Sequence, residues 1–325
     1  MDDTTPTAAT PPTAPAAGTP LDHLLSLVTL EPLGERRWRG RAGADDGWDS
    51  VYGGHFLGQA TAAACASVES GRRLHSAHGY FLKAGVAADP IDYEVEVVRD
   101  GRSFCTRRVR ATQGKGVNFE LLASFTVEEA GPTLPAEVPA DFAALPDPDS
   151  LPTYTELMRS RDPVPFPEGW AFGERGLDIR VINAPWCDAG PSPRGGIRTW
   201  NRTTGPLPDD PALHAAVFAY LSDDSISDNV LVPFGVTWST PGTMVFSLDH
   251  AMWLHRPFRM DEWHLVEQWP VVAESARGSP RVRCSTVGAC WWRRSPRRRW
   301  SGSDRRGDGG MSAPSSSTAN VHPAR

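Results

Sequence analysis

The sequence predicts an α+β fold of two similar halves, each with one buried helix wrapped by a curled antiparallel β-sheet. Three observations support this prediction. Residues 56–66 are apolar on nearly every side of a helix and residues 212–221 around its circumference, and a helix without a polar face must be buried all round. Strand-like runs with alternating apolar residues follow each helix. The order of these elements is the same in both halves of the chain.

In the first half, Gly53 and Gly54 begin the helical segment. The segment 99–102, Arg-Asp-Gly-Arg, is typical of a hairpin turn between two strands. Four strands are expected here, and they cover residues 75–82, 91–98, 104–111 and 117–125.

The second half repeats this order, with strands expected at residues 243–254 and 264–273. The stretch 76–82 aligns with 248–254 through a histidine and through a leucine four residues later. We expect the two sheets to join edge to edge, because a joined edge is no longer open to aggregation.

Composition changes outside the two halves. The first residues are Pro, Ala and Thr, with too little apolar surface to offset the entropy of ordering. A central stretch with nine prolines is typical of a linker. The predicted organisation is therefore a disordered leader at 1–20, a first half at 21–130, a linker at 131–167, a second half at 168–278, and an aberrant, disordered tail at 279–325.

Composition also excludes several protein classes. The five cysteines form no CxxC pair, which predicts reduced thiols and neither a disulfide framework nor a metal site. The acidic start resembles neither a signal peptide nor a transit peptide, and no stretch approaches the roughly 18 apolar residues of a membrane span. We therefore expect a cytoplasmic protein without a membrane span, and we expect no cofactor.

Five stretches resemble the acyl-CoA thioesterase II family, whose members have a double hotdog fold. The most specific is residues 248–258, LDHAMWLHRPF. The other four occur in the same order as in the family, at 51–60, 74–82, 99–104 and 219–223.

The resemblance implies hydrolysis of acyl-CoA to a free fatty acid and coenzyme A by direct attack of water. A carboxylate, a hydroxyl and a glutamine would orient that water. The carboxylate is expected at Asp223, although this residue also fits a solvated loop, and the hydroxyl at Ser247, where the family usually has Thr. Gly53, Gly54 and His55 are expected to bind substrate, with His55 in place of a family glutamine. The resemblance also implies assembly into homo-oligomers.

Other histidines fit a catalytic role less well. His75 and His78 are candidate general bases, but a histidine on a half-buried strand is more often structural. Asp249 and His250 resemble a catalytic dyad, yet neighbouring residues on a strand point to opposite faces. We favour a structural role for these residues.

The sequence departs from the family after Gly278. The family glutamine should fall near Arg297, where the chain instead has Trp, Arg and Pro, and residues 279–325 carry ten Arg and two acidic residues. Pro280 and Pro296 remove strand hydrogen-bond donors. We interpret this change as a reading-frame shift, which predicts that the second half lacks its last strands and that activity is impaired.

Two other functions stay open on the sequence alone. The scaffold could bind acyl-CoA without cleaving it. The basic tail, with its tryptophans, could bind nucleic acid through phosphate contacts and base stacking. We expect no specific nucleic-acid partner, because basic tails without a groove-fitting fold are commonly nonspecific.

Overall fold

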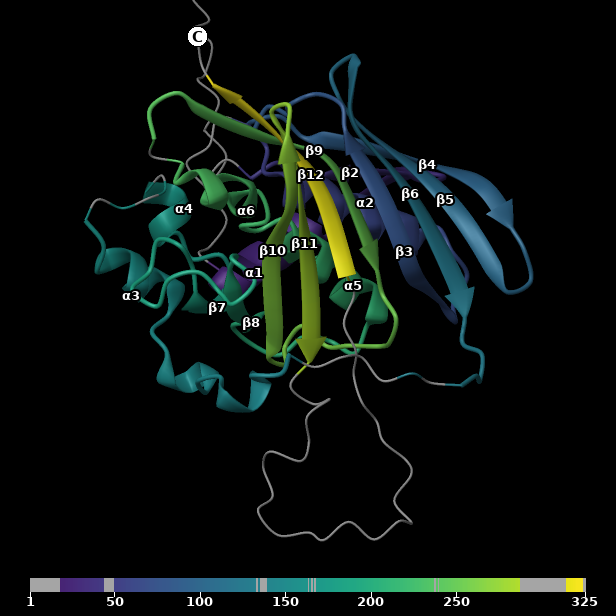
Figure 1. Cartoon of the computed structure of the whole chain (residues 1–325). Coiled ribbons are helices and arrows are strands. Elements are labelled where there is room, and N and C mark those ends of the chain that lie inside the picture. The colour runs from purple at the N-terminus through teal and green to yellow at the C-terminus, as the bar shows by residue number, and fades with distance from the viewer. Residues whose placement is uncertain are drawn as a thin grey trace, which may run out of the picture.

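A computed structural model describes residues 18–43, 50–132, 134, 139–162, 164, 166, 168–236, 238, 240–286 and 314–323, the last of these as backbone only. The strands in this part of the chain form one antiparallel sheet of twelve strands. Their order is β1-β2-β4-β5-β6-β3-β9-β12-β11-β10-β8-β7. Figure 1 shows the sheet curling around the helices α2 and α5, with the first half in blue and the second in green.

The first half begins with helix α1. Thr19 and Asp22 cap this helix reciprocally, so ordered chain begins earlier than the expected boundary at residue 21. Residues 1–17 of the expected leader lie outside the described residues. The elements are α1 (Pro20–Val28), β1 (Glu31–Gly34), β2 (Arg37–Gly40), α2 (Gly53–Ala66), β3 (Arg72–Phe81), β4 (Ile91–Asp100), β5 (Phe104–Gln113) and β6 (Gly116–Val127).

The second half has the longer set of elements. These are η1 (Phe142–Ala144), η2 (Pro148–Ser150), α3 (Tyr154–Arg159), α4 (Glu168–Phe172), β7 (Leu177–Asn183), β8 (Arg198–Thr203), α5 (Pro211–Ser222), α6 (Asp228–Leu231), η3 (Val232–Phe234), β9 (Thr243–Trp253), β10 (His264–Glu274), β11 (Arg277–Thr286) and β12 (Pro314–Pro323).

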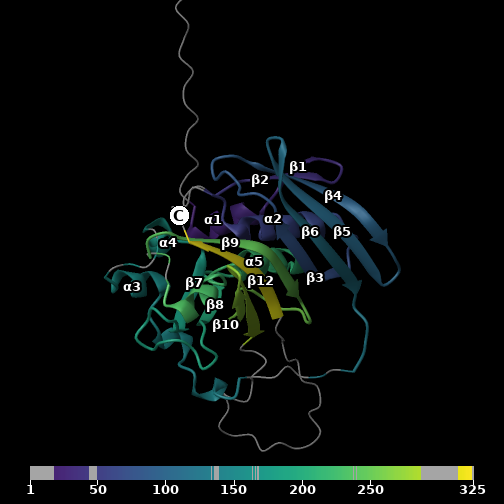
Figure 2. The same cartoon turned by 45° about the horizontal axis from the view of Figure 1, so that its top comes forward.

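The two halves join where β3 pairs with β9, and this confirms the expected edge-to-edge contact. The pairing is antiparallel and runs from Ser76 opposite Trp253 to Tyr80 opposite Asp249. Strand order is mirrored on the two sides of this seam, since β6, β5 and β4 occupy the places that β12, β11 and β10 take in the other half. Figure 2 shows α2 and α5 side by side, close to β3 and β9.

Helices α2 and α5 are buried along most of their length and pack against each other. Two glycines of α2 allow this close approach. A β-carbon at Gly54 would collide with the carbonyl of Tyr220, and one at Gly58 would lie 3.1 Å from the carbonyl of Ala216. The glycines of the first helical motif therefore bring the two halves into contact.

The proline-rich segment does more than join the halves. Phe142 and Leu145 are buried and pack in one cluster with Trp200 of β8 and Leu265 of β10. The Trp200 indole donates a hydrogen bond of 3.1 Å to the carbonyl of Pro146. The described part of the expected linker therefore covers the sheet of the second half.

The expectation that the second half lacks its last strands is wrong. β11 pairs with β10, and β12 lies between β11 and β9. β11 forms because Val282 and Cys284 are buried while Arg281 is exposed, which is the alternation of a half-buried strand. Pro280 is tolerated because it lies opposite Pro270, next to an irregularity in the register. The tail is thus ordered at 279–286 and 314–323, and residues 287–313 lie outside the described residues.

Candidate active site

Asp223 lies where the two halves meet. It follows the last residue of α5 and is buried, with 8% of its surface exposed. One carboxylate oxygen, Oδ2, occupies the space that a β-carbon on Gly53 would take. Since Gly53 is the first residue of α2, the carboxylate lies at the N-terminus of that helix. The positive end of the α2 dipole therefore faces the Asp223 carboxylate.

Burial raises the pKa of Asp223 to about 7, from an ordinary value of 3.8. The negative charge of Asp224 raises this pKa further, whereas the hydrogen bond from Ser247 lowers it. In the structure the main cause is loss of solvent, and the result is a carboxyl group that can take up and release a proton near neutral pH.

Ser247 contacts this carboxyl group from β9. Its Oγ donates a hydrogen bond of 3.4 Å to Asp223 Oδ1. The register of β9 shifts at this point, because Ala319 pairs with Ser247 and the preceding Thr318 pairs with Asp249. Leu248 is therefore an extra residue, a β-bulge, and it changes which residues of β9 face inward.

The bulge turns His250 toward Asp223 as well. His250 has no exposed surface, and its Nδ1 lies 3.7 Å from Asp223 Oδ1. Its Nε2 lies 3.0 Å from the hydroxyl of Ser222. Burial lowers the pKa of His250 to about 4, so the ring is neutral at physiological pH. Sequence reasoning missed this contact, since nothing in the sequence marks the bulge.

Asp249 points away from Asp223, as predicted for the neighbour of an inward-facing residue. It accepts a hydrogen bond from His78 across the β3–β9 seam, with 2.9 Å between Nε2 and Oδ2. His75 forms a hydrogen bond of 2.8 Å with the hydroxyl of Ser124. The two histidines of β3 are therefore engaged with other side chains rather than with the Asp223 carboxyl group.

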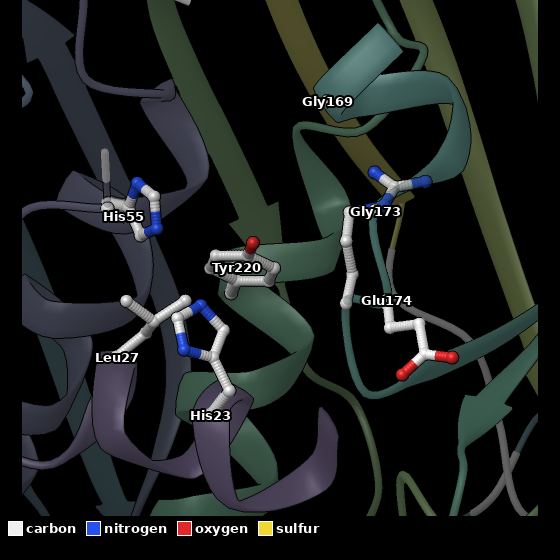
Figure 3. Close-up of a pocket in the computed structure, with 9 residues that line it drawn as sticks. His23, Leu27, His55, Gly169, Gly173, Glu174 and Tyr220 are labelled. Carbon is white, nitrogen blue, oxygen red and sulfur yellow. The ribbon is translucent and has the colours of Figure 1, made fainter. Parts of the chain in front are cut away.

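The three residues expected to bind substrate do not lie together. Gly53 lies against Asp223, while Gly54 lies in the contact between α2 and α5. His55 lines a cavity of about 240 Å³ with Tyr220 and His23. Figure 3 shows these three rings pointing toward one another from α2, α5 and α1. Burial lowers the pKa of His55 to about 4, and neither ring nitrogen has a partner among the described residues.

A buried polar network lies behind Asp223, and sequence reasoning missed it. Arg175 forms an ion pair of 3.0 Å with Asp224. Gln268 donates to the carbonyl of Asp224 at 2.8 Å and accepts from Asn229 at 2.7 Å. Both ends of the Gln268 amide are thus engaged in this network. Arg297 lies outside the described residues.

Two further findings concern the described ranges only. Within them, no helix is long and apolar enough to cross a lipid bilayer. They also contain no group of three or more His, Cys, Asp or Glu side chains arranged to hold a metal ion.

Comparison with known proteins assigns the chain to a family. A family model described as the acyl-CoA thioesterase N-terminal domain matches residues 44–126, and one described as acyl-CoA thioesterase matches residues 194–281. Acyl-CoA thioesterase 2 of Haemophilus influenzae is 33% identical over 253 residues, which are 75% of this chain and 85% of that protein. The chain belongs to the acyl-CoA thioesterase II family. Human acyl-coenzyme A thioesterase 8 is also 33% identical, over 78% of this chain and 80% of that protein.

Solved structures agree with this membership. An acyl-CoA thioesterase II from Mycobacterium marinum is 30% identical and superposes with a TM-score of 0.69, over 92% of this chain and 98% of that one. A hot dog fold protein from Alicyclobacillus acidocaldarius, 17% identical with a TM-score of 0.69, shows the fold alone. The chain is therefore a thioesterase with the hotdog type of fold, built from helices and antiparallel strands.

Proposed function

We propose that this chain hydrolyses acyl-CoA thioesters to a free fatty acid and coenzyme A by direct attack of water. The fold would be a double hotdog, with α2 and α5 as its two central helices. One observation carries the mechanism: a buried carboxyl group with a pKa of about 7, Asp223, lies between the hydroxyl of Ser247 and the N-terminus of α2.

Each part of this arrangement has a chemical task. Asp223 would accept a proton from the attacking water, a step that contributes about 10²- to 10⁴-fold in rate. The Ser247 hydroxyl would orient the carboxylate and the water through hydrogen bonds. Backbone N–H groups at the start of α2 would stabilise the oxyanion that forms on the thioester carbonyl. No covalent intermediate is required, because a thioester carbonyl is electrophilic enough for a well-placed water.

Asp228 is the competing carboxyl group, since burial also raises its pKa to about 7. Its Oδ1 accepts a hydrogen bond of 2.5 Å from the indole of Trp238. Asp223 is favoured because it lies at the N-terminus of a long helix and next to a hydroxyl that can bind water. A shared pKa therefore does not give the two residues the same role.

We further propose that turnover by the present chain is weak. The resemblance places the family glutamine near position 297. In the structure, the residue paired with Ser247 on the neighbouring strand is Ala319 of β12. Similarity to the second family model ends at residue 281. The frameshift hypothesis remains a prediction, and sequencing the gene across codons 275–300 tests it. It is rejected if no one-base change restores a strand that ends in Gln-Glu.

Thiol release from a medium-chain acyl-CoA tests the proposed reaction. We expect slow turnover by the full chain, a loss of at least about 100-fold in Asp223→Asn, and a smaller effect in Asp228→Asn. Protection against heat by acyl-CoA without any thiol release would instead indicate a binding protein. Equal losses in both variants would remove the special role of Asp223.

We also propose a cytoplasmic location. The four cysteines among the described residues, Cys65, Cys105, Cys187 and Cys284, are unpaired, as is usual where thiols stay reduced.

A further inference from the structure

We propose that His250 is a positioning residue, whose Nδ1 holds the proton that Asp223 takes from the attacking water. The proposal rests on the proposed hydrolysis for its kinetic consequences only. The contact between His250 and Asp223 is a feature of the fold and can be tested without turnover.

The hydrogen bonds of Ser222 fix the tautomer of His250. Ser222 Oγ donates its one proton to the carbonyl of Ala219 at 2.9 Å. It must therefore accept from His250 Nε2, which lies 3.0 Å away. A neutral imidazole carries one proton, so Nδ1 presents a bare lone pair.

That lone pair faces Asp223. Nδ1 has no hydrogen-bond partner among the described residues, and Asp223 Oδ1 lies 3.7 Å from it. An ionised carboxylate and a bare nitrogen are both acceptors, so the pair has no bond of its own. A protonated Asp223 removes this conflict, because it can donate to Nδ1 once the two atoms approach to about 2.8 Å. His250 therefore favours the protonated form of Asp223.

In the reaction this preference acts at one step. The water oxygen forms a bond to the thioester carbon, and one water proton passes to Asp223. His250 Nδ1 accepts a hydrogen bond from this proton and is not itself protonated. When the carbon–sulfur bond breaks, the proton passes from Asp223 to the leaving sulfur, which gives the free thiol of coenzyme A. Asp223 is then ionised again.

Other charged or titratable groups surround the pair and are the same in every comparison below. Asp224 is held by Arg175, and Asp249 is held by His78. The groups that interact electrostatically with the pair are Asp224 after α5, Tyr52 before α2, Asp249 on β9 and His78 on β3. Arg175 after α4, Tyr220 on α5 and Asp228 at the start of α6 interact in turn with Asp224 or with Tyr52.

Two substitutions distinguish the role of Nδ1 from the role of Nε2. His250→Gln keeps a donor near Nε2 but removes the acceptor at Nδ1. His250→Asn places an amide oxygen near the position of Nδ1. The control is His264→Gln, which changes another buried, neutral imidazole whose Nε2 bonds the carbonyl of Arg259.

The pH profile of kcat/KM in the full chain is the first measurement. We expect His250→Gln to move the acid limb about 1 pH unit lower and to reduce the rate at pH 8 about 10-fold, since Asp223 becomes a weaker base. In His250→Asn and in His264→Gln, the acid limb should stay close to its position in the unchanged chain. The proposal is overturned if His250→Gln leaves the limb in place, or if His250→Asn moves it as far.

Infrared titration decides the proposal without turnover. The absorption band of the protonated Asp223 carboxyl group is identified by its absence in Asp223→Asn. This band is then followed as pH rises. In His250→Gln it should disappear at a lower pH than in the unchanged chain. If no variant releases thiol, the proposed function fails while this band still tests His250. Should His250→Gln not fold, Ser222→Ala serves instead. Ser222→Ala removes the acceptor of the Nε2 proton, so the ring can carry its proton on Nδ1 and donate it to the ionised Asp223. This should lower the pH at which the Asp223 carboxyl group is half protonated. An unchanged midpoint contradicts the proposal.

Discussion

The carboxylate of Asp223, just after α5, occupies the place of the missing side chain of Gly53, at the start of α2. A residue of the second half and a residue of the first half thus share one space. Gly53 of the first half therefore leaves room for the carboxylate of the second half, and both halves contribute to the candidate active site.

Gly53→Ala should abolish most activity. The added methyl group collides with Asp223 Oδ2 and also lies 3.1 Å from the ring of Phe81, so the carboxylate must move away from the α2 N-terminus. We expect a loss of about 100-fold or more in thiol release, because misplaced catalytic groups lose the benefit of orientation. Gly116→Ala is the matched control, since its β-carbon would meet only the distant end of Lys83. Equal activity of the two variants would show that Asp223 does not need its present position.

The acid limb of kcat/KM should have its midpoint near pH 7. Burial raises the pKa of Asp223 to about 7, and only the ionised form accepts a proton. The rate should therefore rise as pH increases through this value and should level off above it. A limb near pH 4, the range of an ordinary aspartate, would place the essential base elsewhere.

The same pKa predicts a cost in stability. Because the folded pKa lies above 3.8, the free energy of unfolding falls by roughly 1.4 kcal/mol per pH unit as pH rises from about 4 to about 7, and then stays level. Asp223→Asn has no ionisable group at this position, so this fall in the free energy of unfolding is absent. Its melting temperature should thus exceed that of the unchanged chain by an amount that grows across this window. Asp188→Asn, at a carboxylate that is 96% exposed, should show no such growth.

Ser247 should tolerate threonine but not alanine. Ser247→Ala removes the donor to Asp223 Oδ1, and we expect thiol release to fall about 10-fold, in line with one lost hydrogen bond to a charged group. Ser247→Thr keeps the donor and restricts its rotamer, so activity should be kept or raised. A threonine variant as slow as the alanine variant would argue that the hydroxyl plays no part.

Local pattern was sufficient to predict the central elements of both halves. The helix at Gly53–Ala66 and the strand at Ile91–Asp100 follow from apolar periodicity, and the structure confirms both. The helix and the strand depend on residues close together in the chain, which is why the sequence shows them. An edge-to-edge contact of the two sheets was expected because a joined edge is closed to aggregation, but only the structure shows that β3 and β9 form it.

Long-range features were harder to predict. The inward turn of His250 depends on the bulge at Leu248, which only the partner strand defines. The short strands β1, β2, β7 and β8 gave no clear alternation, since β1 is exposed throughout and β8 is buried on nearly every residue. The prediction that the second half lacks its last strands failed because composition was given more weight than the alternation of Val282 and Cys284 in β11.

Strand β12 gives a last prediction, on the tail. Its backbone pairs with β9 from Thr243 to Met252 and with β11 on its other side, so it covers two strand edges and lies opposite Ser247. Ending the chain after Thr286 removes β12 and leaves both edges open. We expect a lower melting temperature, association through the open edges, and loss of any thiol release, because Ser247 loses its neighbouring strand.

Light scattering and thermal melting of the shortened chain check this expectation. The matched control ends after Pro323 and keeps the whole of β12. It should behave like the full chain, because it removes only two residues beyond the strand. If ending the chain after Thr286 changes neither melting nor association, residues 314–323 do not close the sheet, and the earlier interpretation of the tail as a segment without structural function is restored.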